Sequence, residues 1–365
     1  MSPASINIVD AYPVDYFAAR RRFVAECARS GWELQSHRID APSPNDEPLF
    51  LDVAVLGTGQ PASALVISSG LHGVEAKFGS AVQWAFMNSL DTDWRPPQDA
   101  AIVLLHALNP FGFAWHRRFN EDNVDLNRNF LVENEAYTGA PPLSETFRSV
   151  LMPASYHQRI RWWPARMALL AMRHGVGSFW HTMPVGQYEF PDWLFFGGHA
   201  RTQSAEILDR ILPTMFDQAT DIVHLDMHTG LGRWSECELL LGDAESDVNC
   251  QWWHEHFREF RVRQTAVAAS SYAVRGGFGQ WLQTRFPRCR YRFAVAEFGT
   301  YSPRRVIQAL AEELHWHLRL GADAKDHWSR RNLADVFVPN DRRWRETTLR
   351  TGLAVARHAV DVLWH

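Results

Sequence analysis

Apolar residues follow two different spacings along the chain. Short, nearly continuous apolar runs at 51–56, 64–68, 101–106, 222–227 and 292–296 are typical of strands that are covered on both faces. Segments with apolar residues three or four positions apart predict helices at 14–30, 74–90, 200–216, 246–260, 303–320 and 345–364. Because the predicted strands and helices alternate, we expect an α/β fold with helices on both sides of a sheet. In such a fold, ligands bind beyond the carboxyl ends of the strands.

The segment at about 131–200 departs from this alternation. It is rich in Trp, Pro, Gly and His, as in SFWHTMPVGQYEFPDWLFFGGH. We interpret it as a long insertion over the ligand-binding edge, whose aromatic side chains either narrow the cleft or pack at the surface. No internal repeat, charge block or Gly/Ser linker divides the chain, so 1–365 is expected to form a single domain.

Composition and charge restrict the class of protein. Of the 365 residues, 46% are hydrophobic and 21% are charged, which excludes disordered and low-complexity classes. The net charge of −4 favours neither nucleic acid nor an anionic membrane as a partner. The start of the chain lacks the apolar region of a signal peptide, and no stretch reaches the ~18 uninterrupted apolar residues of a membrane span. We therefore expect a soluble, cytoplasmic protein.

Two histidines and a glutamate have the pattern of a metal site. His72 and Glu75 follow a predicted strand and stand three residues apart, so both can reach one ion from the same face of a helix. His228 lies at the end of another predicted strand, where it is either a third ligand or a capping residue. Two histidines and one carboxylate with an open position are typical of catalytic zinc. Asp226 shares a strand face with His228 and either orients it or makes a structural hydrogen bond.

A buried acid and a cluster of donors accompany these residues. Glu297 lies within an apolar run, where an unpaired carboxylate would cost several kcal/mol. Such a glutamate either accepts the proton of a metal-bound water or forms a structural ion pair with an arginine. The segment 109–128 follows a further strand and supplies amide and guanidinium donors, which suit a carboxylate or an oxyanion.

With these residues in place, the chain resembles the zinc carboxypeptidase family, of which carboxypeptidase A is typical. The resemblance rests on H-G-V-E at 72–75, N-P-F-G-F at 109–113, V-D-L-N-R-N-F at 124–130, D-M-H-T-G at 226–230 and A-E-F-G-T at 296–300. It is strongest to a bacterial branch, with likeness to the aspartoacylase and succinylglutamate desuccinylase group. The resemblance implies a three-layer α/β/α sandwich with a mixed, mostly parallel central sheet.

The resemblance also implies roles for individual residues of the metal site. His72, Glu75 and His228 would bind one zinc ion per chain, and Glu297 would be the general base and acid. Asp125 would accept the N–H of His72 and fix its tautomer.

Four further residues take substrate roles by the same resemblance. Arg118 would polarise the scissile carbonyl, with Arg117 as the alternative, and Asn127 with Arg128 would bind the terminal carboxylate of the substrate. Tyr272, in SYAVRGGFGQWL, would belong to a mobile tyrosine loop.

The sequence therefore predicts a zinc-dependent hydrolase that cleaves an amide bond next to a free carboxylate, in a small peptide or an N-acyl amino acid. Gly279 would occupy the position that sets side-chain specificity, and it is neither apolar nor acidic. Two alternatives stay open: an N-acyl amino-acid deacylase or esterase of the aspartoacylase type, and a carboxylate-binding protein without catalysis.

Overall fold

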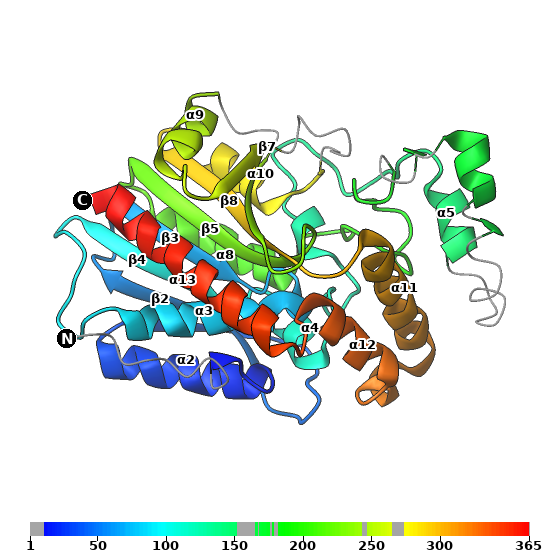
Figure 1. Cartoon of the computed structure of the whole chain (residues 1–365), viewed down its shortest axis with the longest axis horizontal. Coiled ribbons are helices and arrows are strands. Elements are labelled where there is room, and N and C mark those ends of the chain that lie inside the picture. The colour runs from blue at the N-terminus through cyan, green and yellow to red at the C-terminus, as the bar shows by residue number, and fades with distance from the viewer. Residues whose placement is uncertain are drawn as a thin grey trace.

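The computed structural model describes residues 11–151, 165–166, 168–175, 177–178, 182–242, 247–264 and 274–364. They contain an eight-stranded sheet with strand order β1-β2-β4-β3-β5-β8-β6-β7 (Figure 1). The strands are β1 (Glu33–Ile39), β2 (Leu49–Gly57), β3 (Ser63–Ser69), β4 (Ala100–His106), β5 (Asp221–Gly230), β6 (Cys237–Leu241), β7 (Arg261–Gln264) and β8 (Arg290–Gly299). The central strands β4, β3, β5 and β8 are parallel, whereas β1–β2, β2–β4 and β6–β8 pair antiparallel.

Helices cover both faces of this sheet. Leu65 and Ile67 of β3 pack into one core with α3 (Ala76–Ser89) and α13 (Arg342–Trp364). Ala64 and Val66, which alternate with them, pack into a second core with α8 (Gln203–Met215) and α10 (Phe278–Arg285). Because successive side chains of a strand point to opposite faces, these two cores define three layers. The mixed sheet between helices is the predicted α/β/α sandwich.

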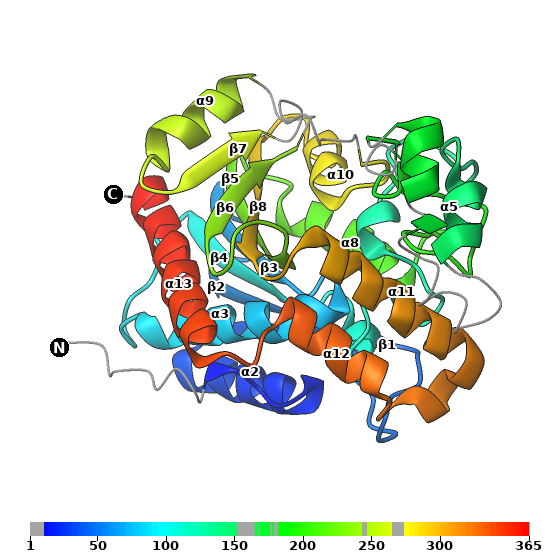
Figure 2. The same cartoon turned by 45° about the vertical axis from the view of Figure 1, so that its right-hand side comes forward.

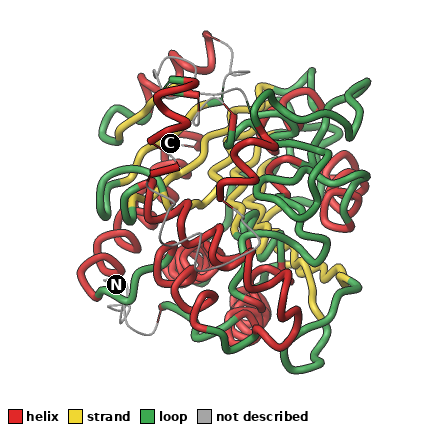
Figure 3. Tube along the Cα trace, turned by 90° about the vertical axis from the view of Figure 1, so that its right-hand side faces the viewer, coloured by secondary structure: helices red, strands yellow, loops and turns green. Residues whose placement is uncertain are grey.

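The other helices lie mainly around the edges of this sandwich. They are α2 (Tyr16–Ser30), α4 (Pro110–Trp115), α5 (Ser144–Leu151), α9 (Asp247–His256), α11 (Pro303–Leu320) and α12 (Trp328–Phe337). Figures 1 and 2 show α5, α11 and α12 at the same end of the molecule, and Figure 3 looks onto this end, where loops are abundant. No helix of the described residues combines the length and the apolar character needed to cross a membrane.

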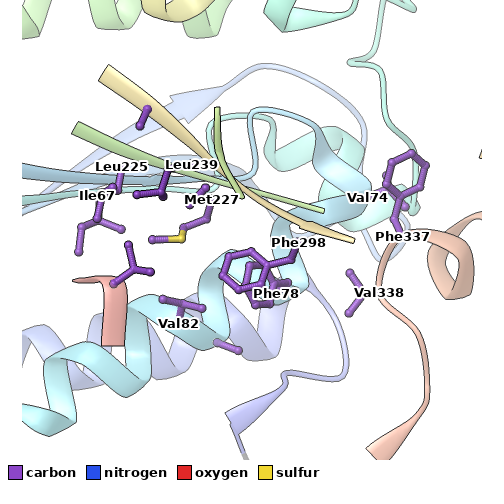
Figure 4. Close-up of a cluster of buried hydrophobic side chains, with 14 of the residues drawn as sticks. Ile67, Val74, Phe78, Val82, Leu225, Met227, Leu239, Phe298, Phe337 and Val338 are labelled. Atoms are coloured by element: carbon purple, nitrogen blue, oxygen red, sulfur yellow. The ribbon is translucent and has the colours of Figure 1, made fainter. Parts of the chain in front are cut away.

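The core next to the sheet fixes which side chains face the site. Met227, Phe298 and Phe78 are buried in one cluster on the α3 side of the sheet (Figure 4). Their strand neighbours His228 and Glu297 therefore point to the opposite face. These two residues are direct partners in the parallel β5–β8 pairing, so their side chains lie next to each other.

Five strands were expected, and β2, β3, β4, β5 and β8 contain them. The edge strand β1 has mostly exposed or half-buried residues, so it carries no apolar run, and β6 and β7 are only five and four residues long. The predicted helix at 246–260 ends at His256, followed by β7. The helices α4, α5, α10 and α12 were not predicted, and they span only six, eight, eight and ten residues. The described part of 131–200 adds no strand to the sheet.

Candidate metal centre

A tight turn after β3 presents His72 and Glu75 together. His72 precedes a short 3-10 helix, Gly73–Glu75, that leads directly into α3. Gly73 packs so closely on α4 that a Cβ there would lie 2.2 Å from the carbonyl carbon of Gly112. Within this turn, Nδ1 of His72 lies 2.9 Å from Oε1 of Glu75. The predicted pair thus shares one face, as its spacing implies.

His228 completes the set from the end of β5. Its Nδ1 lies 3.1 Å from Nδ1 of His72 and 3.0 Å from Oε2 of Glu75. One ligand atom from each of the three buried residues lies within 4.8 Å of the others. Zinc holds nitrogen and oxygen ligands at ~2.0–2.2 Å in a tetrahedron, which places them about 3.4 Å apart. The spacing and chemistry of these three residues fit such an ion.

Each histidine turns its other nitrogen toward a carboxylate. Nε2 of His228 lies 2.6 Å from Oδ2 of Asp226, and Nε2 of His72 lies 3.3 Å from Oδ1 of Asp125. Carboxylates in these positions hold the imidazole so that its remaining nitrogen faces the metal. Asp226 thus makes the direct contact with His228 that an orienting role requires.

Neighbouring positive charges keep the carboxylates of Asp125 and Glu75 ionised. Burial alone raises the pKa of Asp125, but the Arg118 guanidinium and His72 outweigh it and hold that pKa well below its ordinary value. Burial likewise opposes the effect of His72 and His228 on Glu75, whose pKa also lies below its usual range. The site is therefore a buried cluster of mutually compensating charges.

Glu297 stands beside His228 with a different electrostatic character. Its Oε1 accepts the backbone N–H of Leu231 at 2.7 Å. Burial, followed by the Glu75 carboxylate, raises the pKa of Glu297 to about 7. Among the described residues no ion pair joins it to an arginine. A carboxyl group of this pKa can take up and release a proton near neutral pH.

The two neighbouring arginines go to different places. Arg118 enters the site, where its Nε donates to Asp125 at 2.9 Å and its Nη2 lies 2.6 Å from Nε2 of His72. Arg117 is completely buried, and its Nε donates to Glu313 of α11 at 2.8 Å. Of the two, Arg118 is therefore the one that contacts the residues of the candidate metal centre.

The predicted substrate residues lie on the adjacent turn. Arg128 donates Nε–H to the carbonyl of Pro184 at 3.0 Å, and Oδ1 of Asn127 accepts the N–H of Phe278 at 3.0 Å. Tyr272 lies outside the described residues. Gly279 lies in α10, where a Cβ would be 2.4 Å from the Phe293 ring. Packing alone thus explains the absence of a side chain at 279, and this glycine gives no information on specificity.

Sequence reasoning placed the 131–200 segment over the ligand-binding edge but did not identify which of its residues contact the site. Phe195 lies with its ring 5.5 Å from the Arg118 guanidinium and 5.6 Å from that of Arg128. The carbonyl of Phe196 accepts the N–H of Asp125 at 2.8 Å. The only signal was the density of aromatic residues, which does not reveal their partners.

The fold is that of metallocarboxypeptidases. Bovine thrombin-activatable fibrinolysis inhibitor, solved with a tick carboxypeptidase inhibitor, is 12% identical and superposes with a TM-score of 0.52 over 97% of this chain and 98% of that one. Carboxypeptidase A from Helicoverpa armigera is 13% identical, with a TM-score of 0.44 over 91% of this chain and 73% of that one. The first of these similarities confirms the predicted carboxypeptidase-like fold.

A family profile assigns the chain more narrowly. The chain belongs to the family described as "Protein of unknown function (DUF2817)", which matches residues 12–351. A search among curated protein sequences gave no significant match.

Proposed function

We propose that this protein is a zinc-dependent hydrolase that cleaves an amide bond next to a free carboxylate. The observation that carries the proposal is the convergence of Nδ1 of His72, Nδ1 of His228 and the Glu75 carboxylate, with Glu297 in register beside His228. A purely structural site has no use for a buried carboxyl group of raised pKa at that position.

His72, Glu75 and His228 would hold the zinc ion, which supplies Lewis acidity and a water of lowered pKa. Glu297 would accept the proton of the attacking water and later deliver it to the leaving amine. The Arg118 guanidinium would stabilise the negative charge that develops on the carbonyl oxygen. Asp125 and Asp226 would hold the two imidazoles in the required orientation.

Asn127 and Arg128 would bind the carboxylate of the substrate, because a guanidinium matches a carboxylate in a bidentate manner. To do so, Arg128 would exchange its hydrogen bonds to the carbonyls of Pro184 and Asn127 for the carboxylate. Arg128 adjoins the Phe195 ring and donates to the Pro184 carbonyl, both of which belong to the 131–200 segment. Arg128 is 3% exposed. This cover favours a small substrate.

A second candidate, an N-acyl amino-acid deacylase, is favoured by this cover over Arg128. Both reactions use the same metal, base and arginine, and they differ in the group on the acyl side of the bond. Assays of short peptides beside N-acyl amino acids would separate the two activities.

The test begins with the metal content of the purified protein, measured by mass spectrometry. We expect about one zinc ion per chain in the wild type, and its loss in His72→Ala and in His228→Ala. A matched control is His106→Ala, which removes a buried histidine of β4 outside the site. Absence of metal after zinc is supplied would contradict the hydrolase and leave a carboxylate-binding protein. Zinc without hydrolysis of either substrate class would contradict the reaction but keep the site.

A further inference from the structure

A buried chain of polar side chains runs through the sheet from His228 away from the site. Nε2 of His228 contacts Oδ2 of Asp226 at 2.6 Å, and Oδ1 of Asp226 accepts the hydroxyl proton of Ser68 at 2.6 Å. Oγ of Ser68 lies 2.7 Å from Nε2 of His224, whose Nδ1 lies 2.9 Å from the Tyr291 hydroxyl. All five side chains are buried. None of the last three reaches the reacting groups directly.

The strand register brings these residues together. His224, Asp226 and His228 alternate along β5 and therefore share one face of the sheet. Ser68 of β3 is the direct parallel partner of Asp226. Tyr291 lies on β8, on the other side of β5. Three adjacent strands, β3, β5 and β8, thus contribute to this chain of hydrogen bonds.

The number of available protons fixes the direction of every hydrogen bond. An ionised Asp226 only accepts, so it receives a proton from Ser68 and another from Nε2 of His228. Ser68 has then used its one proton, so its oxygen must accept from Nε2–H of His224. Burial lowers the pKa of His224 to about 4, so the ring is neutral and its Nδ1 carries no proton. This Nδ1 must accept the proton of the Tyr291 hydroxyl.

We propose that Ser68, His224 and Tyr291 are positioning residues of the metal centre, which hold the Asp226 carboxylate so that His228 keeps its proton on Nε2 and presents Nδ1 to the metal. The inference rests on the proposed function in so far as it requires a metal at His228. It assigns a role to buried polar residues that packing alone does not explain, since an apolar residue at each position would avoid the cost of burying a polar group.

The first test measures zinc affinity by competition with a chelator. Outer partners of metal-bound histidines typically contribute ~10–100-fold to metal affinity. We expect Ser68→Ala to weaken zinc binding by roughly tenfold, near the lower end of that range, and Tyr291→Phe to weaken it less. His224→Gln, which keeps an amide donor toward Ser68, should retain more affinity than His224→Phe.

Ser80→Ala is the matched control. Ser80 also forms a buried hydrogen bond with a histidine, His106, at 3.1 Å, but that pair does not lead to the site. We expect its zinc affinity to equal that of the wild type. Zinc binding in the wild type with unchanged affinity in both Ser68→Ala and Tyr291→Phe would overturn the inference while leaving the proposed function intact.

A second test needs neither metal nor a stable variant. Nitrogen-15 NMR of the metal-free wild type, labelled at histidine, reports which ring nitrogen carries the proton. We expect His224 to be neutral with its proton on Nε2. A proton on Nδ1 of His224 would reverse the direction of the chain and overturn the inference, whatever the result with zinc.

Discussion

The two histidines of the candidate metal centre are held in opposite ways. His228 stands on a central strand, and a single carboxylate, Asp226, contacts its Nε2 at 2.6 Å. His72 stands on a turn, and its Nε2 lies between an acceptor, Asp125 at 3.3 Å, and a donor, Arg118 at 2.6 Å. The strand half of the centre, His228 with Asp226, therefore defines one tautomer of its histidine. In the loop half, His72 with Asp125 and Arg118, the tautomer depends on how the arginine is placed.

The two halves differ because different interactions hold their side chains in place. Strand register places His228, Glu297 and the chain below them through backbone pairing of β3, β5 and β8. The loop half is held instead by distant segments, since Asp125 bonds to Phe196 and Arg128 to Pro184. We infer that the sheet supplies a preorganised ligand and base, while the 131–200 segment holds Arg118 and Arg128, which the proposed function places on the substrate side.

The largest expected effect tests the strand half. Glu297→Gln removes the group that exchanges protons but leaves the ligands, so kcat should fall by roughly 10²–10⁴-fold with zinc content unchanged. Glu238→Gln is the control, because Glu238 is the direct partner of Glu297 on β6 and is ion-paired with Arg261 and Arg263. Its kcat should stay within a few-fold of the wild type. Steady-state rates of Glu297→Gln close to those of the wild type would refute the assigned role.

The next effect tests the loop half and compares two adjacent arginines. Arg118→Gln should lower kcat by about 10²–10³-fold, because the developing oxyanion loses its charged partner. Arg117→Gln should instead lower the free energy of unfolding by about 3 kcal/mol, because the buried Glu313 loses its 2.8 Å ion pair and keeps the longer one, 3.8 Å, with Arg330. Rate measurements and urea titrations on both variants separate the two roles. If both variants lost the same rate and had the same free energy of unfolding, the two arginines would not have the separate roles proposed.

The strand half was largely predictable from the sequence. A buried parallel strand shows itself as an apolar run, and a polar residue at its end, such as His228 or Glu297, is conspicuous. The order of the motifs also led to the carboxypeptidase-like fold, which the structural similarity confirms. Edge strands such as β1 were missed because their exposed faces carry polar residues.

The loop half was predictable only in its residue types. The resemblance selected Arg118 over Arg117. The structural reason is that Arg117 is bonded in the core to Glu313, which lies almost 200 positions further along the chain. The contact of Phe195 with two arginines depends on the path of the 131–200 segment, which no periodicity encodes. Ser68 and His224 are polar residues within apolar runs, and the spacing of those runs does not indicate that the two side chains contact each other.

Acid should destabilise the sheet beside the metal centre, through a buried neutral histidine of β4 that belongs to neither half. Burial lowers the pKa of His106 from 6.5 to about 4, so the unfolded chain takes up a proton at this ring before the folded one does. Stability is therefore complete above the unfolded pKa and is lost as pH falls toward the folded one, by roughly 2 kcal/mol at about pH 5 for this histidine. Urea unfolding at neutral and acid pH measures the loss, which His106→Phe should reduce. An unchanged pH dependence in that variant would contradict the assignment.

The smallest effect tests how the 131–200 segment holds the substrate side. Phe195 adopts a left-handed backbone with φ of 57°, which is unfavourable for an aromatic residue and keeps its ring beside Arg118 and Arg128. Phe195→Leu keeps an apolar side chain but removes the ring, so KM should rise by roughly three- to tenfold while kcat changes less, consistent with about 1 kcal/mol of cation–π attraction. Phe195→Tyr, which keeps the ring, should retain the wild-type KM. If the Leu and Tyr variants share one KM, the aromatic ring has no part in placing the arginines, and the loop half must be ordered by its backbone hydrogen bonds alone.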